Sequence, residues 1–360
     1  MADEKLTETD ALEQLSSIHD PEIGRSFGDL NMLKSLSVSA DGQVDVQVEL
    51  PTPAYPKRER IAEALQAAIA DRWPSATLNV EFTADVKGKN VGGAIGLQVR
   101  NVIAVGSGKG GVGKSTVASS LAYGLKEHGA SVGLMDADVY GPSIPHMFGV
   151  TTERPAAVER TNEKGEPYQR IEPIVADGLK IISMGFFVEP EKAVIWRGPM
   201  LHRAITQFLK ETEWGPLDYL IIDMPPGTGD VSLSLSQSVG LAGAVIVCTP
   251  QQVALLDAVK AISMFQQVNI PVLGIVENMT GDVFGRGGAK QKAQDMGVPF
   301  LGEVPIEADI RVKTDSGDIA ALFAEDSPAR GPLMNVCEQT AMQIARTLLE
   351  TPSMPTLEVL

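Results

Sequence analysis

The sequence predicts an α/β protein made of a small N-terminal αββαβ domain and a larger domain with a mostly parallel sheet covered by helices. Three observations predict this class. The N-terminal part contains a strictly alternating apolar segment, which is typical of a strand with one buried face. After residue 98, short and continuously apolar segments alternate with helical patterns, as in parallel sheets buried on both faces. A glycine-rich loop separates the first of these strands from a helix.

The composition divides the chain into two domains and a linker. Its 360 residues are enough for about two domains. We expect a small α/β domain at residues 1–86, a glycine-rich linker at 87–98 and the larger domain at 99–360. The linker contains KGKNVGGAIGL, which has neither a helical nor a strand period and is rich in flexible glycine.

The N-terminal domain is expected to begin with a helix. Thr9 and Asp10 are suitable capping residues, and apolar residues then recur at helical spacing until Asp20-Pro21 ends the pattern. In QVDVQVEL, which ends at Leu50, apolar and polar residues alternate and predict a half-buried strand. The elements expected after the first helix are a strand, a strand, a helix and a strand, at residues 32–39, 43–50, 57–73 and 76–82.

The larger domain is expected to contain seven buried strands with helices between them. The strands are predicted at residues 102–105, 132–135, 180–183, 219–222, 244–247, 272–276 and 300–302. The polar stretch 151–170 is expected to be a surface loop or a hairpin arm.

A glycine-rich loop carries the strongest chemical signal. It follows the strand at 102–105 and precedes a helical pattern, so its backbone N–H groups and the positive helix end can bind phosphate. Lys114 is expected to reach the β- and γ-phosphates, and Ser115 to hold Mg²⁺. The predicted nucleotide-binding residues of the loop are Gly108, Lys109, Gly110, Gly111, Val112, Gly113, Lys114, Ser115 and Thr116.

Three aspartates follow predicted strands on the same edge of the sheet. Asp223 ends the strand at 219–222 and precedes the loop MPPGTGD, which is suited to sensing a γ-phosphate. Asp136 and Asp138 follow the strand at 132–135. Magnesium and an attacking water both need carboxylates beside the phosphates, so these residues are candidates for binding the metal or positioning the water.

Lys109 is a second lysine within the loop, where phosphate binding requires only Lys114. Its side chain has no good target on phosphates that its own backbone surrounds. Lys109 is therefore either a cation that reaches the phosphates of a facing subunit or an ordinary exposed loop lysine.

The charge and hydropathy of the chain limit its partners. The net charge of −16 and the pI near 4.7 oppose binding to nucleic acid. The acidic start MADEKLTETD lacks the features of an export signal, and the longest apolar stretch is about half of what a spanning helix requires. The tail LLETPSMPTLEVL is acidic and interrupted by proline, unlike a membrane-binding basic helix. We expect a soluble, cytoplasmic protein with neither nucleic acid nor membrane as partner.

With these motifs in place, the chain resembles a known family. GKGGVGKST, DADVYGPSIP, IIDMPPGTGD, WRGPM and VENM resemble the deviant Walker A class that includes MinD, and most closely the Mrp (ApbC) iron-sulfur carriers. DPEIGRSFGDLNML, PTPAYP and EFTADV resemble the small N-terminal domain of the bacterial members. The resemblance implies an ATP-hydrolysing homodimer that uses ATP and Mg²⁺ and that serves apoprotein clients or iron-sulfur assembly proteins.

The resemblance also implies roles for individual residues. Lys109 corresponds to the lysine that acts across the dimer, and Lys114 is the phosphate-binding lysine. Asp138 corresponds to the water-orienting residue and Asp223 to the Walker B carboxylate, while Asp136 is a further candidate for binding Mg²⁺. Asn278 would contact the adenine, with Pro305 nearby.

The chain departs from the family at the cysteines. Family members usually carry C-x-x-C after the ENM segment, where this chain has TGDVF, and often a cysteine where this chain has Tyr55. Cys248 ends an apolar strand and is expected in the core, whereas Cys337 is either structural or a thiol paired across a dimer as an iron-sulfur ligand. Two functions stay open: a cluster carrier, and an ATP-switched assembly scaffold or regulator that holds no cluster.

Overall fold

The computed structural model describes residues 6–88, 97–162, 164–187, 198–227, 235 and 238–350. The chain forms two compact units, residues 1–87 with 341–360, and residues 88–340. All of 99–360 was expected to form one domain, whereas the structure groups the residues from Ala341 onward with the N-terminal unit. Most of the expected linker lies outside the described residues, as do Trp196 and Arg197 of the WRGPM segment.

The N-terminal unit has the predicted αββαβ order. Its elements are α1 (Glu8–Ser17), β1 (Leu33–Val38), β2 (Gln43–Leu50), α2 (Arg58–Arg72) and β3 (Thr77–Ala84). Strand β2 is central, antiparallel to β1 and parallel to β3. Its alternating apolar residues are buried, as predicted. The expected cap is wrong by two residues, because Thr7 begins the helix by accepting a 3.2 Å hydrogen bond from the backbone N–H of Asp10.

The last turns of α10 (Arg330–Glu350) complete the core of this unit. Met342 is fully buried among the apolar residues of α1, α2 and β2, and Leu349 packs against the same cluster. Arg346 donates a 2.7 Å hydrogen bond to the carbonyl of Glu22. The small unit therefore takes part of its core from the far end of the sequence.

The larger unit contains an eight-stranded sheet in the order β13-β12-β11-β4-β10-β5-β9-β8. The seven predicted strands are confirmed, and all pair in parallel. Only β8 (Ile174–Ala176), which runs antiparallel at the edge, was not predicted. The parallel strands are β4 (Val99–Gly106), β5 (Val132–Asp136), β9 (Leu179–Ser183), β10 (Leu217–Asp223), β11 (Gly243–Cys248), β12 (Val272–Thr280) and β13 (Phe300–Pro305).

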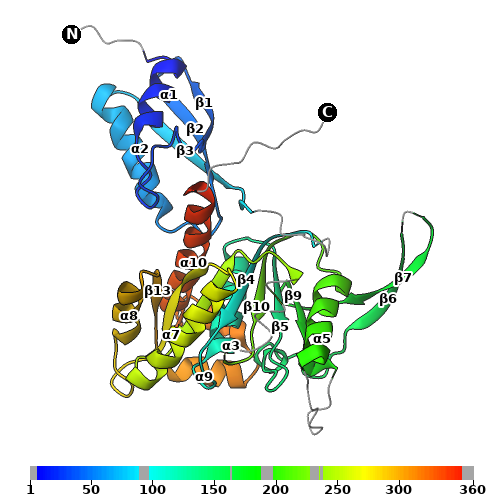
Figure 1. Cartoon of the computed structure of the whole chain (residues 1–360). Helices are drawn as coiled ribbons and strands as arrows, with labels where there is room; N and C mark the ends of the chain where they lie inside the picture. Colours follow the sequence, from blue (N-terminus) through cyan, green and yellow to red (C-terminus); the bar gives the residue numbers. More distant parts are fainter. Residues whose placement is uncertain are drawn as a thin grey trace. The chain divides into compact units, whose positions relative to one another are not determined.

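Helices cover both faces of this sheet (Figure 1). Val102, Ala104 and Ile222 lie in one core cluster with apolar side chains of α5 and α7. Helix α3 packs against β4, β5 and β10. Its buried residues contact the face of the sheet opposite to α5 and α7, so they do not belong to that cluster. The helices are α3 (Lys114–Glu127), α4 (Ile144–Met147), α5 (Gly198–Glu211), α7 (Gln252–Gln267), α8 (Gly288–Met296) and α9 (Ala308–Asp315), with short 3-10 helices η2 (Met184–Phe186) and η3 (Ile319–Phe323).

The polar stretch 151–170 contributes to an antiparallel hairpin, which confirms the hairpin alternative. Its strands β6 (Ala156–Thr161) and β7 (Pro167–Glu172) extend from the larger unit as an arm (Figure 1). Within the part of the chain that is described, no helix has the length and apolar character needed to cross a membrane.

Candidate nucleotide-binding site

The glycine-rich loop connects the end of β4 to the first residue of α3 at Lys114. Gly113 precedes the helix with a φ of 80°, in the left-handed region that favours glycine. A Cβ atom on Gly113 would lie 2.1 Å from Nδ2 of Asn278, and one on Gly108 would lie 2.1 Å from the carbonyl oxygen of Asp257 in α7. The loop thus needs glycine at both positions, because β12 and α7 hold it from two sides.

The loop borders a cavity of about 270 Å³ at the carboxyl ends of the strands. Most of the predicted nucleotide-binding residues line it, namely Lys109, Gly110, Gly111, Gly113, Lys114, Ser115 and Thr116, together with Asp138. Gly108 and Val112 are not among the lining residues. Five further lining residues were not singled out. Ser107 and Met147 lie outside the motifs, whereas Gly141, Ser143 and Pro226 lie within DADVYGPSIP and MPPGTGD. Of the predicted sensor loop, residues 228–230 lie outside the described residues.

Lys114 is the centre of a buried charge cluster. Its Nζ lies 2.5 Å from Oδ1 of Asp223, 3.6 Å from Oδ2 of Asp138 and 3.3 Å from Oγ of Ser115. The Lys114 side chain is only 6% exposed, so these contacts replace most of its hydration. Two carboxylates around one ammonium leave an excess of negative charge that a metal cation can balance.

Asp223 fits a magnesium ligand. Its side chain is fully buried, and Oδ2 has no hydrogen-bond partner among the described residues. Burial raises the pKa of Asp223, while the Lys114 ammonium opposes that rise. A buried carboxylate oxygen without a partner suits a hard divalent cation, which takes oxygen ligands. Ser115, in the same cluster, offers the second oxygen.

Asp136 lies opposite Asp223 in the register of β5 and β10. Its carboxylate accepts hydrogen bonds from Oγ of Ser183 (2.9 Å) and from the backbone N–H groups of Asp138 (3.1 Å) and Ile144 (3.3 Å). Burial, followed by the charge of Asp223, raises the pKa of Asp136 to about 8. In this structure Asp136 therefore holds the loop that carries Asp138, and its role as a magnesium ligand stays a prediction.

The ENM segment also supports the loop. Asn278 donates a 2.9 Å hydrogen bond from Nδ2 to the carbonyl of Val112. The neighbouring Glu277, which was not predicted as a functional residue, is fully buried and accepts 2.7 Å hydrogen bonds from the N–H groups of Gly287 and Ala289 at the start of α8. Pro305 pairs with Thr280 at the end of β13 and does not line the cavity. The adenine contacts of Asn278 and Pro305 stay predictions.

The two cysteines lie in the interior. Cys248 is buried as expected, and burial raises its pKa to about 12. Cys337 is 0% exposed, with Sγ 3.5 Å from the carbonyl oxygen of Ser120, and its role as a cluster ligand across a dimer stays a prediction. Burial raises the pKa of the Cys337 thiol as well. Among the described residues, no group of three or more His, Cys, Asp or Glu side chains is placed to hold a metal ion.

A strand, a glycine-rich loop with two lysines, a helix end and a buried strand-end carboxylate define a P-loop NTPase of the deviant type. Comparison with known families agrees. Residues 98–341 match the ParA family described as NUBPL iron-transfer P-loop NTPase, and residues 8–82 match the family described as iron-sulfur cluster assembly protein. This chain belongs to the family of iron-transfer P-loop NTPases.

Individual relatives cover nearly the whole chain. The iron-sulfur cluster carrier protein of Deinococcus radiodurans is 45% identical over 352 residues, which are 95% of this chain and 97% of the relative. The protein of that name from Escherichia coli K12 is 38% identical over 331 residues, 88% of this chain and 87% of the relative. The family resemblance found in the motifs is thus confirmed.

Solved structures confirm the fold of the larger unit. A nucleotide-binding protein of Archaeoglobus fulgidus, in complex with ADP, is 37% identical with a TM-score of 0.54, and the match covers 65% of this chain and 91% of that protein. The septum site-determining protein MinD of Pyrococcus horikoshii shares the fold at 22% identity and a TM-score of 0.50, over 66% of this chain and 94% of that protein.

Proposed function

We propose that this chain is a homodimeric ATPase that binds Mg-ATP, hydrolyses it slowly, and takes part in carrying iron-sulfur clusters to apoproteins. The observation that carries the ATPase part is the buried cluster of Lys114, Asp138 and Asp223 at the wall of the loop cavity. Slow turnover suits a protein whose ATP-bound and ADP-bound states must each persist long enough to be used.

Each residue of this site has a separate role in phosphoryl transfer. When ATP binds, the Lys114 ammonium leaves the Asp223 carboxylate and contacts the β- and γ-phosphates. Ser115 and Asp223 would hold Mg²⁺, whose charge balances the phosphate oxygens. Asp138, at the cavity wall, accepts a hydrogen bond from the attacking water and orients it toward the γ-phosphorus.

Two substitutions test this assignment. Lys114→Ala should abolish nucleotide binding or hydrolysis, whereas Asp138→Ala should spare binding and reduce hydrolysis, as measured by ATP titration and by phosphate release. Lys126→Ala, in the last turn of the same helix, is the control and should behave like the parent. Unchanged hydrolysis in Lys114→Ala would refute the role of this loop.

The homodimer is supported by what lies around the cavity. Lys109 lines the cavity and forms no ion pair with a described residue. Four large apolar side chains on loops and helix starts after β5, β11 and β12 are strongly exposed: Tyr140 (70%), Val253 (68%), Leu256 (66%) and Val283 (77%). These segments all follow the carboxyl ends of the strands, so a second copy placed face to face would bury them. The same arrangement would bring Lys109 to the partner's phosphates.

A charged substitution among these exposed apolar residues tests the proposed dimer. Leu256→Glu should keep the chain monomeric in Mg-ATP, because one carboxylate would be buried without a partner at each contact. Val175→Glu is a matched control, since Val175 is 62% exposed but lies in the edge strand β8. Light scattering should give the dimer mass for the parent and the control only. A dimeric Leu256→Glu variant would place the interface elsewhere.

A second candidate function is an ATP-switched scaffold that holds no cluster itself. It is favoured by the burial of both cysteines, because a bridging cluster takes four thiolates. The curated relatives named above are cluster carriers, which favours carriage with thiols from the client. Both versions predict little stable iron and sulfide on the purified chain after anaerobic reconstitution and gel filtration.

The rate of cluster delivery to a client distinguishes a carrier from a scaffold. A carrier should take a cluster when mixed with a thiol-bearing client and should speed its delivery, in an ATP-dependent way, relative to the client alone. A scaffold should bind the client without iron and leave the delivery rate unchanged. A stoichiometric cluster on the purified chain alone would show that ligands were misjudged.

A further inference from the structure

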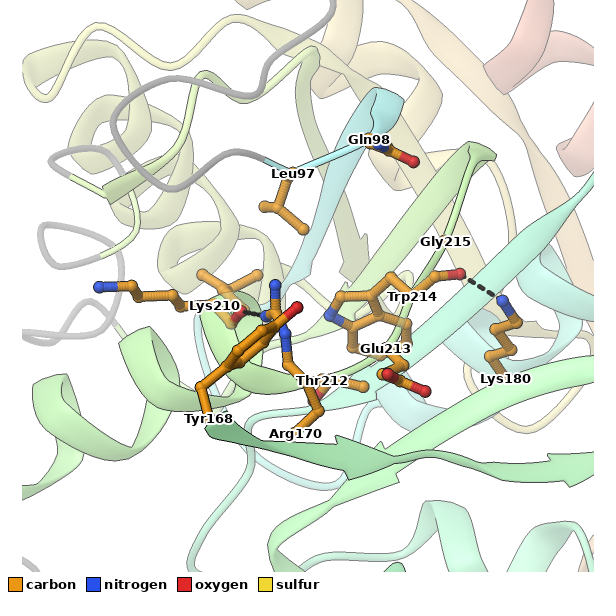
Figure 2. A pocket seen from close by; sticks show the side chains of 11 residues that line it. Leu97, Gln98, Tyr168, Arg170, Lys180, Lys210, Thr212, Glu213, Trp214 and Gly215 are labelled. Carbon is orange, nitrogen blue, oxygen red and sulfur yellow. Dashed lines mark hydrogen bonds between the residues drawn. The ribbon is translucent and has the colours of Figure 1, made fainter. Parts of the chain in front are cut away.

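A second cavity of about 410 Å³ lies on the opposite edge of the sheet from the nucleotide site. Figure 2 shows the residues that line it. Gln98 and Gly215 precede β4 and β10, and Lys180 is near the start of β9. These are the amino ends of parallel strands whose carboxyl ends reach the P-loop. At about 3.3 Å per residue, the length of β10 separates the two cavities by roughly 20 Å, so they are distinct sites.

The lining of this cavity is basic. Arg170, Lys180 and Lys210 line it, in a chain whose net charge is −16. The acidic lining residue is Glu213, whose carboxylate is held by the guanidinium of Arg160 through bonds of 2.5 and 2.8 Å. Because that charge is already balanced, the three cations give the cavity a net positive field.

Several hydrogen-bond donors here are incompletely used. The Arg170 guanidinium donates from Nη1 to the carbonyl of Lys210 and stacks 5.4 Å from the Tyr168 ring centre, which fixes its plane and leaves further N–H groups. Lys180 donates one bond, 2.5 Å long, to the carbonyl of Trp214 (Figure 2). The Lys210 ammonium has no ion-pair partner among the described residues.

The cavity wall also includes a buried threonine and an indole ring. Thr212 lines the cavity and is nine-tenths or more buried, and its Oγ1 has no hydrogen-bond partner in the described part of the chain. The indole of Trp214 adds an apolar wall to the cavity.

We propose that this cavity is a binding site for a small dianion, either a phosphate group or a dicarboxylate. The planar guanidinium of Arg170 suits an anion with several oxygens, and the Lys180 and Lys210 ammonium groups, which lie on opposite sides of it (Figure 2), add to the positive field. A cavity of this size, with walls from β7, the end of α5 and the strand starts, is in the range of small-molecule pockets. The site is independent of the proposed ATPase activity, because it shares no lining residue with the nucleotide cavity.

Calorimetric titration of the full-length chain at low salt tests the proposal, with inorganic phosphate and succinate as separate probes and acetate as the monoanion control. In the Lys114→Ala chain, one site is expected for phosphate or succinate, and no saturation with acetate. Repeating the titration in Lys114→Ala removes the phosphate affinity of the P-loop, so binding that persists belongs to the second cavity. The probe that binds identifies which dianion class the site takes.

Substitutions locate the site. Lys210→Gln and Arg170→Gln should each weaken binding by about tenfold, the effect of losing one charge-assisted hydrogen bond. Lys164→Gln, in the exposed turn of the hairpin, removes the same charge and should stay within about twofold. If Arg170→Gln unfolds, Lys210→Gln alone decides, because that side chain is exposed. Equal effects of all three variants, or no saturable binding of either dianion, would overturn the proposal.

Discussion

Burial determines the chemistry of single residues in this protein. The same physical condition makes Asp223 a good metal ligand and Cys337 a poor one. Oδ2 of Asp223 is buried and has no hydrogen-bond partner among the described residues, although the Lys114 ammonium contacts the other oxygen. A bound Mg²⁺ would supply the missing partner and lower the cost of burying this carboxylate. The Cys337 thiol is buried in an apolar contact between α10 and α3, where the thiolate is strongly disfavoured.

Thiol labelling tests this difference at the residue scale. With the Cys248 pKa near 12, only about one thiol in ten thousand is a thiolate at pH 8. We therefore expect no reaction of the native chain with a disulfide reagent over minutes, and both cysteines to react in guanidinium chloride. A cysteine that reacts fast in the native chain would place that thiol at the surface.

The motif residues were predictable from sequence because their chemistry depends on spacing along the chain. Lys114, Ser115 and Asp223 follow from the loop and the strand end. Ser107 and Met147 were not predictable, because they lie outside the motifs and join the cavity only through the folding of separate elements. The position of Cys337 was not predictable either, since a helical pattern does not say which side of a helix a neighbouring helix covers.

At the scale of elements, the P-loop is held between α7 and β12. Gly108→Ala would push a methyl group against the Asp257 carbonyl, 2.1 Å away, and should lower the free energy of unfolding by about 1 to 3 kcal/mol. The measurement is urea unfolding without nucleotide, so that a loss of ATP affinity does not contribute.

Gly110→Ala is the matched control for this prediction. A Cβ atom at Gly110 would meet nothing nearer than 3.9 Å, and its φ lies outside the left-handed region. The expected change is below about 0.5 kcal/mol. Equal stability of the two variants would mean that α7 does not constrain the loop.

Most elements could be predicted because the parallel sheet is buried on both faces, and its strands then form continuous apolar segments. β8 has only three residues, too few for a periodic pattern. The first helix begins at Thr7 and not at Thr9 or Asp10, because several capping residues occur together in TETD and sequence alone does not choose among them.

At the scale of the whole molecule, the last turns of α10, from Ala341, belong to the core of the small unit. Met342→Ala should remove about 2 to 5 kcal/mol of stability from that unit, because the side chain is fully buried in its apolar cluster. Hydrogen exchange should quicken in β1, β2 and β3 and stay unchanged in β4 and β10. Gln343→Ala, one residue further along the same helix, is the control and should change neither set of strands.

At the same scale, the exposed apolar residues at the carboxyl ends of the strands in the large unit support the proposed dimer. In that dimer, each active site combines Asp138 of one chain with Lys109 of the other. Lys109→Ala and Asp138→Ala should therefore each be inactive alone. In a mixed dimer, the chain that carries Lys109→Ala retains its own Asp138 and receives Lys109 from its partner.

The most direct test of this account is the ATPase rate of an equal mixture of Lys109→Ala and Asp138→Ala chains. Half of the dimers would be mixed, each with one complete site, so the rate should rise to about a quarter of the parent rate. A mixture no faster than either variant alone, or full activity of Lys109→Ala by itself, would contradict a lysine acting across the dimer.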